Sequence, residues 1–209
     1  MISDMTCREF TEVLASSSPI PGGGSSSAFL AAISASLANM VGSLTVGKPK
    51  FANIEEELRE WMTRADELRC EFLELIEEDA NAFQALIKAF AMPKETPEQQ
   101  KERDDCIEAC LHAAATPPLE TIRRCKETIE LCGKFAEKGS KYVISDAGVG
   151  AVLCRAAMQG AALNVYANTT LMRDKETAQA MNDEADRLMF VSSVRADEIY
   201  GRVYLRMHP

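Results

Sequence analysis

Hydrophobic residues recur at spacings of three and four along almost the whole chain, which is the period of an α-helix. Glycine and proline fall between these periodic segments, where turns are expected. The pattern predicts seven helices, over residues 6–15, 25–46, 53–91, 96–115, 119–137, 145–172 and 175–206. No run of alternating residues competes with it. We therefore expect one all-α domain over residues 1–209, a multi-helix bundle with short connections.

Helix boundaries are predicted from capping and breaking residues. Asn53 has capping-box spacing with Glu56, and Thr96-Pro97 places proline at a first helical position. The triplet Thr116-Pro117-Pro118 is expected to end one helix, because proline lacks the backbone N–H that a helix interior needs.

The segment between Glu12 and Lys48 contains no charged residue. Serines and Asn39 interrupt it too often for a membrane span, and no secretory pattern precedes it. Small residues follow one helical face, which lets another backbone approach closely. We therefore expect a central helix packed on both faces and no membrane association. Such faces, with the long helix over residues 53–91, offer more apolar surface than one bundle hides, so a homodimer is expected.

Composition limits the function further. The net charge of −9 argues against nucleic-acid binding but leaves room for a local site for an anionic small ligand. Seven cysteines without a CxxC pair indicate reduced thiols in a cytoplasmic protein. With only two histidines, no metal-site spacing occurs, and we expect no bound metal.

One carboxylate interrupts the apolar seam of the 53–91 helix. Asp79 falls at a core position, with Leu75 and Phe83 one turn away on either side. Burial of an unpaired carboxylate costs several kcal/mol, unless it pairs with a cation or its pKa rises. A raised pKa suits a general acid or base, whereas a paired aspartate would only set helix register. The pattern does not separate these two interpretations.

Other polar positions are weaker candidates. The Pro-Gly-Gly-Gly-Ser turn at residues 21–25 opens a helix, so its amides are either an anion site or a flexible entry. Asn164 and Asn168 lie on a small-residue stripe and either bind a heteroaromatic ligand or bridge to a neighbouring helix. Asp146 is most simply a first-turn carboxylate, and Lys48 meets either a ligand carboxylate or water.

Five segments together resemble one known family. They are SSSPIPGGGSSSAFLAAISASLANMVGSLTVGKPKF, EEDANAFQALIKAFAMPKET, ATPPLE, ISDAGVGA and GAALNVYANTTLMRD. The chain resembles the C-terminal domain of the formiminotransferase-cyclodeaminase family, including its free-standing methenyltetrahydrofolate cyclohydrolases, and the free-standing type is expected here. Two positions depart from the pattern, Ser27 in place of alanine and Gly139-Ser140 in place of Gly-Asn.

The resemblance implies an all-helical, dimer-forming enzyme acting on folate one-carbon units. It places the family's essential acid at Asp79. It implies substrate-binding positions at Pro21, Gly22, Gly23, Gly24, Ser25, Asn39, Lys48, Asp146, Asn164 and Asn168. The expected reaction is that of a formimidoyltetrahydrofolate cyclodeaminase, with methenyltetrahydrofolate cyclohydrolase or a non-catalytic folate-binding module as alternatives. A tetrahydrofolate derivative is the substrate, and no cofactor is expected.

Overall fold

A computed structural model describes residues 1–208, and α-helices with two short 3₁₀ helices make up nearly all of them. The α-helices are α1 (Cys7–Leu14), α2 (Gly23–Ser43), α3 (Glu55–Phe90), α4 (Pro97–Lys138), α5 (Ile144–Thr169) and α6 (Lys175–Met207). The 3₁₀ helices are η1 (Ile2–Asp4) and η2 (Pro49–Ile54). No strand occurs within residues 1–208, so the all-α prediction is confirmed.

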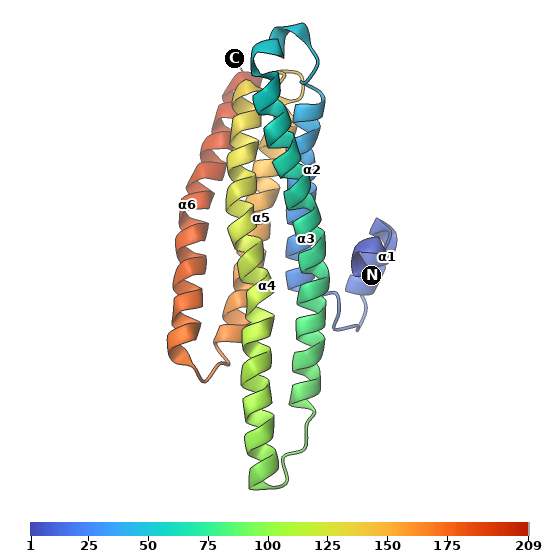
Figure 1. Ribbon diagram of the computed structural model, residues 1–209, viewed down its shortest axis with the longest axis vertical. Helices are drawn as coiled ribbons and strands as arrows, with labels where there is room; N and C mark the ends of the chain where they lie inside the picture. Colours follow the sequence, from blue (N-terminus) through green and yellow to red (C-terminus); the bar gives the residue numbers. More distant parts are fainter. Residues whose placement is uncertain (209) are drawn as a thin grey trace.

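Four long helices, α2 to α5, form the bundle, and α6 packs against α4 and α5 (Figure 1). The hairpin of α3 and α4 extends beyond the other helices at one end (Figure 1). The short helix α1 lies beside the bundle, where the ring of Phe10 packs against Phe29 of α2 at 5.1 Å between centroids.

Small residues let α2 lie in the middle of the bundle. Ala31, Ala35 and Ala38 are fully buried, and a Cβ on Gly42 would lie 2.4 Å from Met62 and 2.8 Å from Phe135. By length and composition α2 could cross a membrane, but 56% of its apolar window is buried inside the bundle. Such burial is typical of the core helix of a helical bundle.

The prediction of a helix break at Thr116-Pro117-Pro118 is wrong, because α4 continues through both prolines. In a regular helix the N–H of residue 118 would bond to the carbonyl of Ala114, and Pro118 has no such donor. The side-chain amide of Asn168 on α5 donates to that carbonyl instead, at 3.1 Å. A neighbouring helix therefore supplies a hydrogen bond that the sequence of α4 cannot make.

Two helix starts also differ from expectation. Asn53 lies within η2, and α3 begins at Glu55 without a side-chain cap, so the predicted capping box with Glu56 is wrong. The central helix begins at Gly23 rather than Ser25. The start of α4 is confirmed, with a reciprocal capping box between Thr96 and Gln99.

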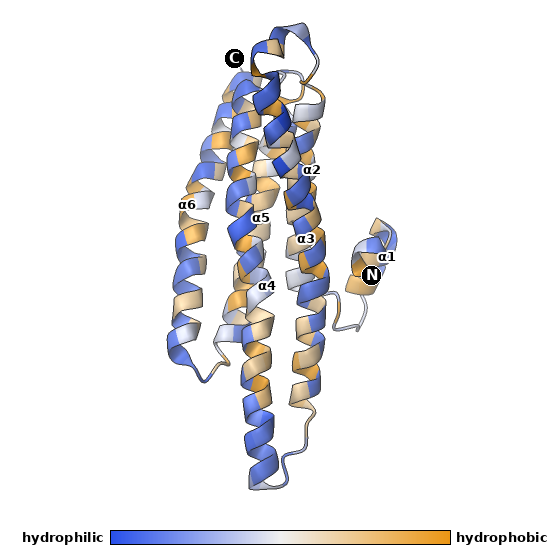
Figure 2. Cartoon of the chain, in the orientation of Figure 1, coloured by the Kyte–Doolittle hydropathy of each residue, from blue (hydrophilic) through white to orange (hydrophobic). Residues whose placement is uncertain are grey.

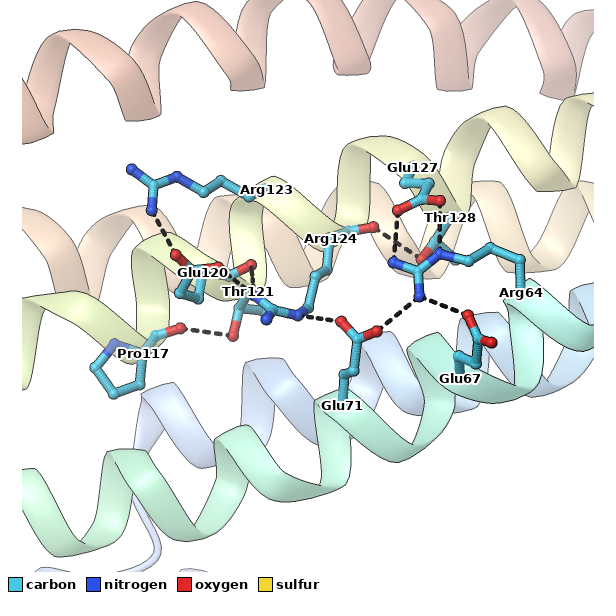
Figure 3. A network of polar contacts seen from close by, with 10 residues as sticks. All are labelled: Arg64, Glu67, Glu71, Pro117, Glu120, Thr121, Arg123, Arg124, Glu127 and Thr128. Atoms are coloured by element: carbon cyan, nitrogen blue, oxygen red, sulfur yellow. Dashed lines mark hydrogen bonds and ion pairs between the residues drawn. The ribbon is translucent and has the colours of Figure 1, made fainter.

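Charged side chains connect α3 and α4 on the outside of the bundle (Figure 3). Arg64 of α3 pairs with Glu127 of α4 at 2.7 Å and with Glu71 at 2.7 Å. Glu71 in turn accepts from Arg124 of α4 at 2.5 Å. These four residues make the solvent side of the α3–α4 pair strongly polar.

The apolar seam of α3 is buried only in part. Phe72 and Leu75 are buried, whereas Phe83 and Phe90 are 40% and 44% exposed. The reason is that α2 begins beside Asp79, so nothing from α2 covers the turns of α3 that follow. The same boundary leaves a hollow around Asp79.

We predict that Asn168→Leu lowers the free energy of unfolding by about 1–3 kcal/mol, because the buried Ala114 carbonyl loses its donor. In a Pro118→Ala background the new backbone N–H supplies that bond, so the same substitution should cost about 1 kcal/mol less. Urea unfolding of the four proteins of this cycle measures the coupling. An equal cost of Asn168→Leu in both backgrounds would contradict the assignment.

Candidate functional site

A cavity of about 150 Å³ lies where the first turn of α2 meets α3, α4 and the end of α5. The segment before α2 closes one side of it. Its lining residues are Pro19, Ile20, Gly22, Gly23, Gly24, Ser25, Asp79, Ala80, Phe83, Ala114, Asn164, Ala167 and Asn168. Backbone amides, one carboxylate and two carboxamides therefore face a hollow whose other walls are apolar.

Asp79 of α3 is held by the first turn of α2. The hydroxyl of Ser25 donates to Oδ2 of Asp79 at 2.7 Å, and the backbone N–H of Ser25 bonds to the same carboxylate. Gly22, the N-cap residue of α2, has no side chain to accept from these first amides. The carboxylate from α3 therefore takes the part that an N-cap side chain usually plays.

Glycine at residue 24 makes this contact possible. A Cβ built there would lie 2.0 Å from Oδ1 of Asp79, well inside van der Waals contact. At Gly23 a Cβ would lie 3.1 Å from Nδ2 of Asn164. The glycine turn is thus required for close packing of two polar side chains against the helix start, beyond any freedom it gives the backbone.

Burial raises the pKa of the Asp79 carboxyl above its ordinary value, and the side-chain and backbone hydrogen bonds from Ser25 oppose that shift only in part. Among residues 1–208, no lysine, arginine or histidine lies within ion-pair distance of Asp79. A half-buried carboxyl of this kind holds its proton to a higher pH than an exposed one, and its ionised form favours a cationic partner.

Both carboxamides use their N–H groups within the protein. The amide nitrogen of Asn164 donates to the Gly160 carbonyl at 2.9 Å, and that of Asn168 donates to the carbonyls of Asn164 and Ala114. Their side-chain oxygens accept no hydrogen bond from the described part of the chain. These oxygens remain available as acceptors for N–H groups of a ligand.

The structure brings seven of the predicted site residues together, namely Asp79, Gly22, Gly23, Gly24, Ser25, Asn164 and Asn168. Pro21 is buried behind the turn and does not line the cavity.

Three predicted residues lie elsewhere in the chain. Asn39 is 16 residues after Gly23 on α2, and Asp146 is 18 residues before Asn164 on α5, which places both roughly 25 Å from the cavity along their helices. Lys48 is exposed beyond the end of α2. Within one chain these residues do not reach the cavity, and their part in substrate binding stays a prediction.

The sequence pattern missed part of the lining. Phe83 was expected in the core seam but forms an exposed wall of the cavity, and Ala114 lines it where α4 passes the proline pair. The departure at Ser27 lies close by, since its hydroxyl donates to the Gly23 carbonyl at 2.8 Å. The Thr116-Pro117-Pro118 triplet was the signal in the sequence that could have located this wall. It marks where a carbonyl of α4 needs a hydrogen-bond donor from another helix.

We predict that Gly24→Ala lowers the free energy of unfolding by about 1–3 kcal/mol, because its methyl group would overlap the Asp79 carboxylate. The matched control is Gly201→Ala in α6, where a Cβ meets nothing within 4 Å and the gain in helix propensity is up to about 1 kcal/mol. Urea unfolding of both variants measures the difference. If Gly24→Ala were as stable as Gly201→Ala, the close contact described here would be wrong.

Comparison with known proteins matches the family model described as formiminotransferase-cyclodeaminase over residues 6–187. The chain is 36% identical over 203 residues to a methenyltetrahydrofolate cyclohydrolase of Methylorubrum extorquens, covering 97% of this chain and 98% of that protein. It is 28% identical to the formimidoyltransferase-cyclodeaminase of Rattus norvegicus, covering 97% of this chain but 38% of the rat protein.

A solved structure has the same architecture. The crystal structure of formiminotetrahydrofolate cyclodeaminase from Thermotoga maritima superposes with a TM-score of 0.84 and 26% sequence identity, covering 100% of this chain and 98% of that one. The chain therefore belongs to the formiminotransferase-cyclodeaminase family.

Proposed function

We propose that this member of the formiminotransferase-cyclodeaminase family acts at the one-carbon bridge of a tetrahydrofolate, with Asp79 as the proton-transfer group. Relatives named as cyclohydrolase and as cyclodeaminase place the chain among folate one-carbon enzymes. The observation that carries the proposal is the half-buried Asp79 carboxyl, which faces a cavity, has a raised pKa and pairs with no cation of residues 1–208.

The charge of the substrate fits this carboxyl. In 5,10-methenyltetrahydrofolate the reacting carbon lies between N5 and N10 in an amidinium group that carries one positive charge. A protonated formimino group is also an amidinium. Such a cation gives the Asp79 carboxylate the partner that the described residues do not provide, and it favours the ionised, basic form of that carboxylate.

For hydrolysis, Asp79 takes a proton from water as the oxygen bonds to the methenyl carbon. The same proton then passes to N5 as the bond between carbon and N5 breaks. The hydroxyl proton is released to solvent as the formyl C=O forms, which gives 10-formyltetrahydrofolate and one H⁺. Proton transfer by one positioned group is typically worth about 10²–10⁴-fold in rate. The amide oxygens of Asn164 and Asn168 are placed to accept N–H groups of the pteridine and so to fix its orientation.

Hydrolysis is the reaction we propose first, because the relative with 36% identity matches this chain over almost the full length of both proteins. Cyclodeamination is the second candidate, supported by the named Thermotoga structure. In that reaction N10 bonds to the carbon of the protonated formimino group, and Asp79 takes the N10 proton. Asp79 then gives this proton to the former imino nitrogen, which leaves as ammonia. The two reactions need the same carboxyl and the same orientation of the substrate.

Proton transfer and positioning are sufficient for this chemistry, so we propose that no metal or redox cofactor takes part. We also propose, independently of the mechanism, that the protein works in the cytoplasm and as a homodimer. No group of three or more metal-ligating side chains occurs in residues 1–208.

Purified protein should consume 5,10-methenyltetrahydrofolate, seen as a fall in methenyl absorbance above the uncatalysed rate. Production of methenyltetrahydrofolate from 5-formiminotetrahydrofolate, seen as a rise, would instead assign the cyclodeaminase. Absence of turnover in both assays, with no thermal stabilisation by either folate, would contradict the proposed function.

We predict that Asp79→Asn reduces turnover about 10²-fold or more while the protein stays folded. The sign of the pKa shift gives a second readout. Because the pKa of Asp79 is higher in the folded protein than in the unfolded chain, wild type loses stability as the pH rises from the unfolded pKa through the folded pKa. The neutral amide of the Asp79→Asn variant does not titrate, so the variant does not lose stability in this way. The melting temperature of Asp79→Asn relative to wild type should therefore increase from pH 4 to neutral pH. Full activity in the variant, or a difference that moves the opposite way, would contradict the role.

A further inference from the structure

Helix α3 continues past the Asp79 cavity as an exposed apolar ridge. Phe83, Ile87 and Phe90 are 40%, 37% and 44% exposed. They follow Asp79 at intervals of four, four and three residues, which places them on the same side of the helix as that carboxyl. We call these three residues the α3 ridge.

Neighbouring helices explain why the ridge is open. Leu86 and Ala89, between its members, are buried, and Leu86 shares a buried cluster with Leu111 of α4. The ridge itself has no such cover, because α2 begins beside Asp79. Figure 1 shows the α3–α4 hairpin extending beyond the other helices, and Figure 2 shows hydrophobic residues along this part of α3. Three large apolar side chains in a row without cover indicate a binding surface.

The ridge begins in the wall of the cavity. Phe83 belongs to the lining of the Asp79 cavity and is the aromatic residue of that lining. The exposed members of the lining are Phe83, Pro19, Gly23 and Ala167, so the mouth of the cavity lies among these four residues. A ligand that leaves the cavity at this mouth therefore meets the ridge at Phe83.

Size requires a second surface of this kind. The cavity of about 150 Å³ is below the roughly 300–1,000 Å³ of pockets that enclose drug-sized ligands. A tetrahydrofolate consists of a reduced pteridine, an aminobenzoyl ring and a glutamate, so only its reacting end fits inside. We propose that Phe83 and Ile87 bind the part that stays outside, with the aminobenzoyl ring against Phe83 and the glutamyl methylenes over Ile87. This inference rests on the proposed function.

Bond lengths and helix rise agree with this placement. N10 is bonded to both the reacting carbon and the benzoyl ring, so the ring centre lies about 4 Å and the glutamate Cα about 9 Å from the reacting carbon. Along α3, Phe83 is about 6 Å and Ile87 about 12 Å from Asp79. With the reacting carbon beside the Asp79 carboxyl, the ring reaches Phe83 and the glutamate side chain reaches Ile87. Phe90, about 16 Å away, lies beyond them.

Charge and ring chemistry favour the same occupant. Between Asp79 and Phe90 the charged residue is Lys88, which lies nine residues after Asp79 and therefore on the opposite side of α3. The glutamate carboxylates of the substrate thus meet no acidic group of α3 along the ridge, although the chain carries a net charge of −9. Two aromatic rings attract each other when offset-stacked or edge to face, an arrangement that the exposed Phe83 side chain can adopt.

Steady-state kinetics of the folate that wild type turns over tests the role of Phe83. Phe83→Ala should raise KM about tenfold with kcat within about twofold, because this contact is equal in the ground state and the transition state. Phe83→Tyr keeps a ring and should stay within about twofold of the wild-type KM. The matched control is Phe90→Ala, on the same side and similarly exposed but beyond the reach of the substrate. Its KM should change less than about twofold. Equal KM values for Phe83→Ala and Phe90→Ala would overturn the proposal.

A shortened substrate separates stacking from a change in cavity shape. A methenyltetrahydropterin that carries a methyl group on N10, in place of the benzoylglutamate, has nothing to place on the ridge. Wild type and Phe83→Ala should convert it with the same KM. If Phe83→Ala raised the KM of this analogue as much as that of the folate, Phe83 would only shape the cavity, and the proposal would be wrong.

Binding of the outer fragment alone does not depend on turnover. Saturation-transfer NMR should detect p-aminobenzoyl-L-glutamate bound to wild type and to Phe90→Ala at millimolar concentration, and not to Phe83→Ala. Fragment binding that Phe83→Ala leaves unchanged, or no binding to wild type, would overturn the inference. If wild type turns over neither folate, the proposed function fails, while this measurement still decides whether the ridge binds the fragment.

Another protein chain is the alternative occupant of the ridge, and sedimentation velocity distinguishes it. Phe90→Arg places a charge on the ridge outside the part assigned to the substrate, so the variant should sediment with the same mass as wild type. A lower mass for Phe90→Arg, with unchanged helical circular dichroism, would show that a second copy covers the ridge. That result would overturn the proposal.

Discussion

The contact between Asp79 and the first turn of α2 is the constraint on which the site depends. Gly22 cannot cap its own helix, so the carboxylate of another helix accepts from Ser25, and Gly24 leaves room for it. This contact fixes where α2 starts, and the start of α2 leaves the following turns of α3 uncovered. The cap of α2, the cavity beside it and the raised pKa of Asp79 therefore have one structural origin. A residue that stabilises a helix end is placed where it can also transfer a proton.

Sequence reasoning identified most helices from local pattern, although the local capping pattern at Asn53 and Glu56 placed the start of α3 wrongly. The 3.6-residue period gave the helices, and one carboxylate among apolar neighbours indicated Asp79. It failed where a distant residue substitutes for a local one. Pro118 would break an isolated helix, but Asn168 donates to the carbonyl that it leaves unpaired. A family motif also does not say how far apart its residues lie in space. Asn39 on α2 and Asp146 on α5 were therefore grouped with Asp79, although each lies several helical turns from the cavity.

Polar groups are divided unequally between the two sides of the bundle. The ion pairs of the α3–α4 side are exposed to water, where each contributes little to stability. Their charges keep this side of the bundle hydrophilic. The α2–α5 side carries small and apolar residues, which permit close packing of α2 and leave Asp79 without a cation. An arginine near Asp79 would lower the pKa of the carboxyl and compete with a cationic substrate. The uncharged character of α2 thus serves packing and chemistry together.

The most direct test of this account is the pKa of Asp79 itself. It can be followed by NMR of carboxyl carbons in ¹³C-labelled protein, with the resonance assigned by its loss in Asp79→Asn. The account predicts titration above the ordinary aspartate value of 3.8, and a fall of that pKa when a cationic folate binds. Titration at or below 3.8 in the free protein would contradict the central claim.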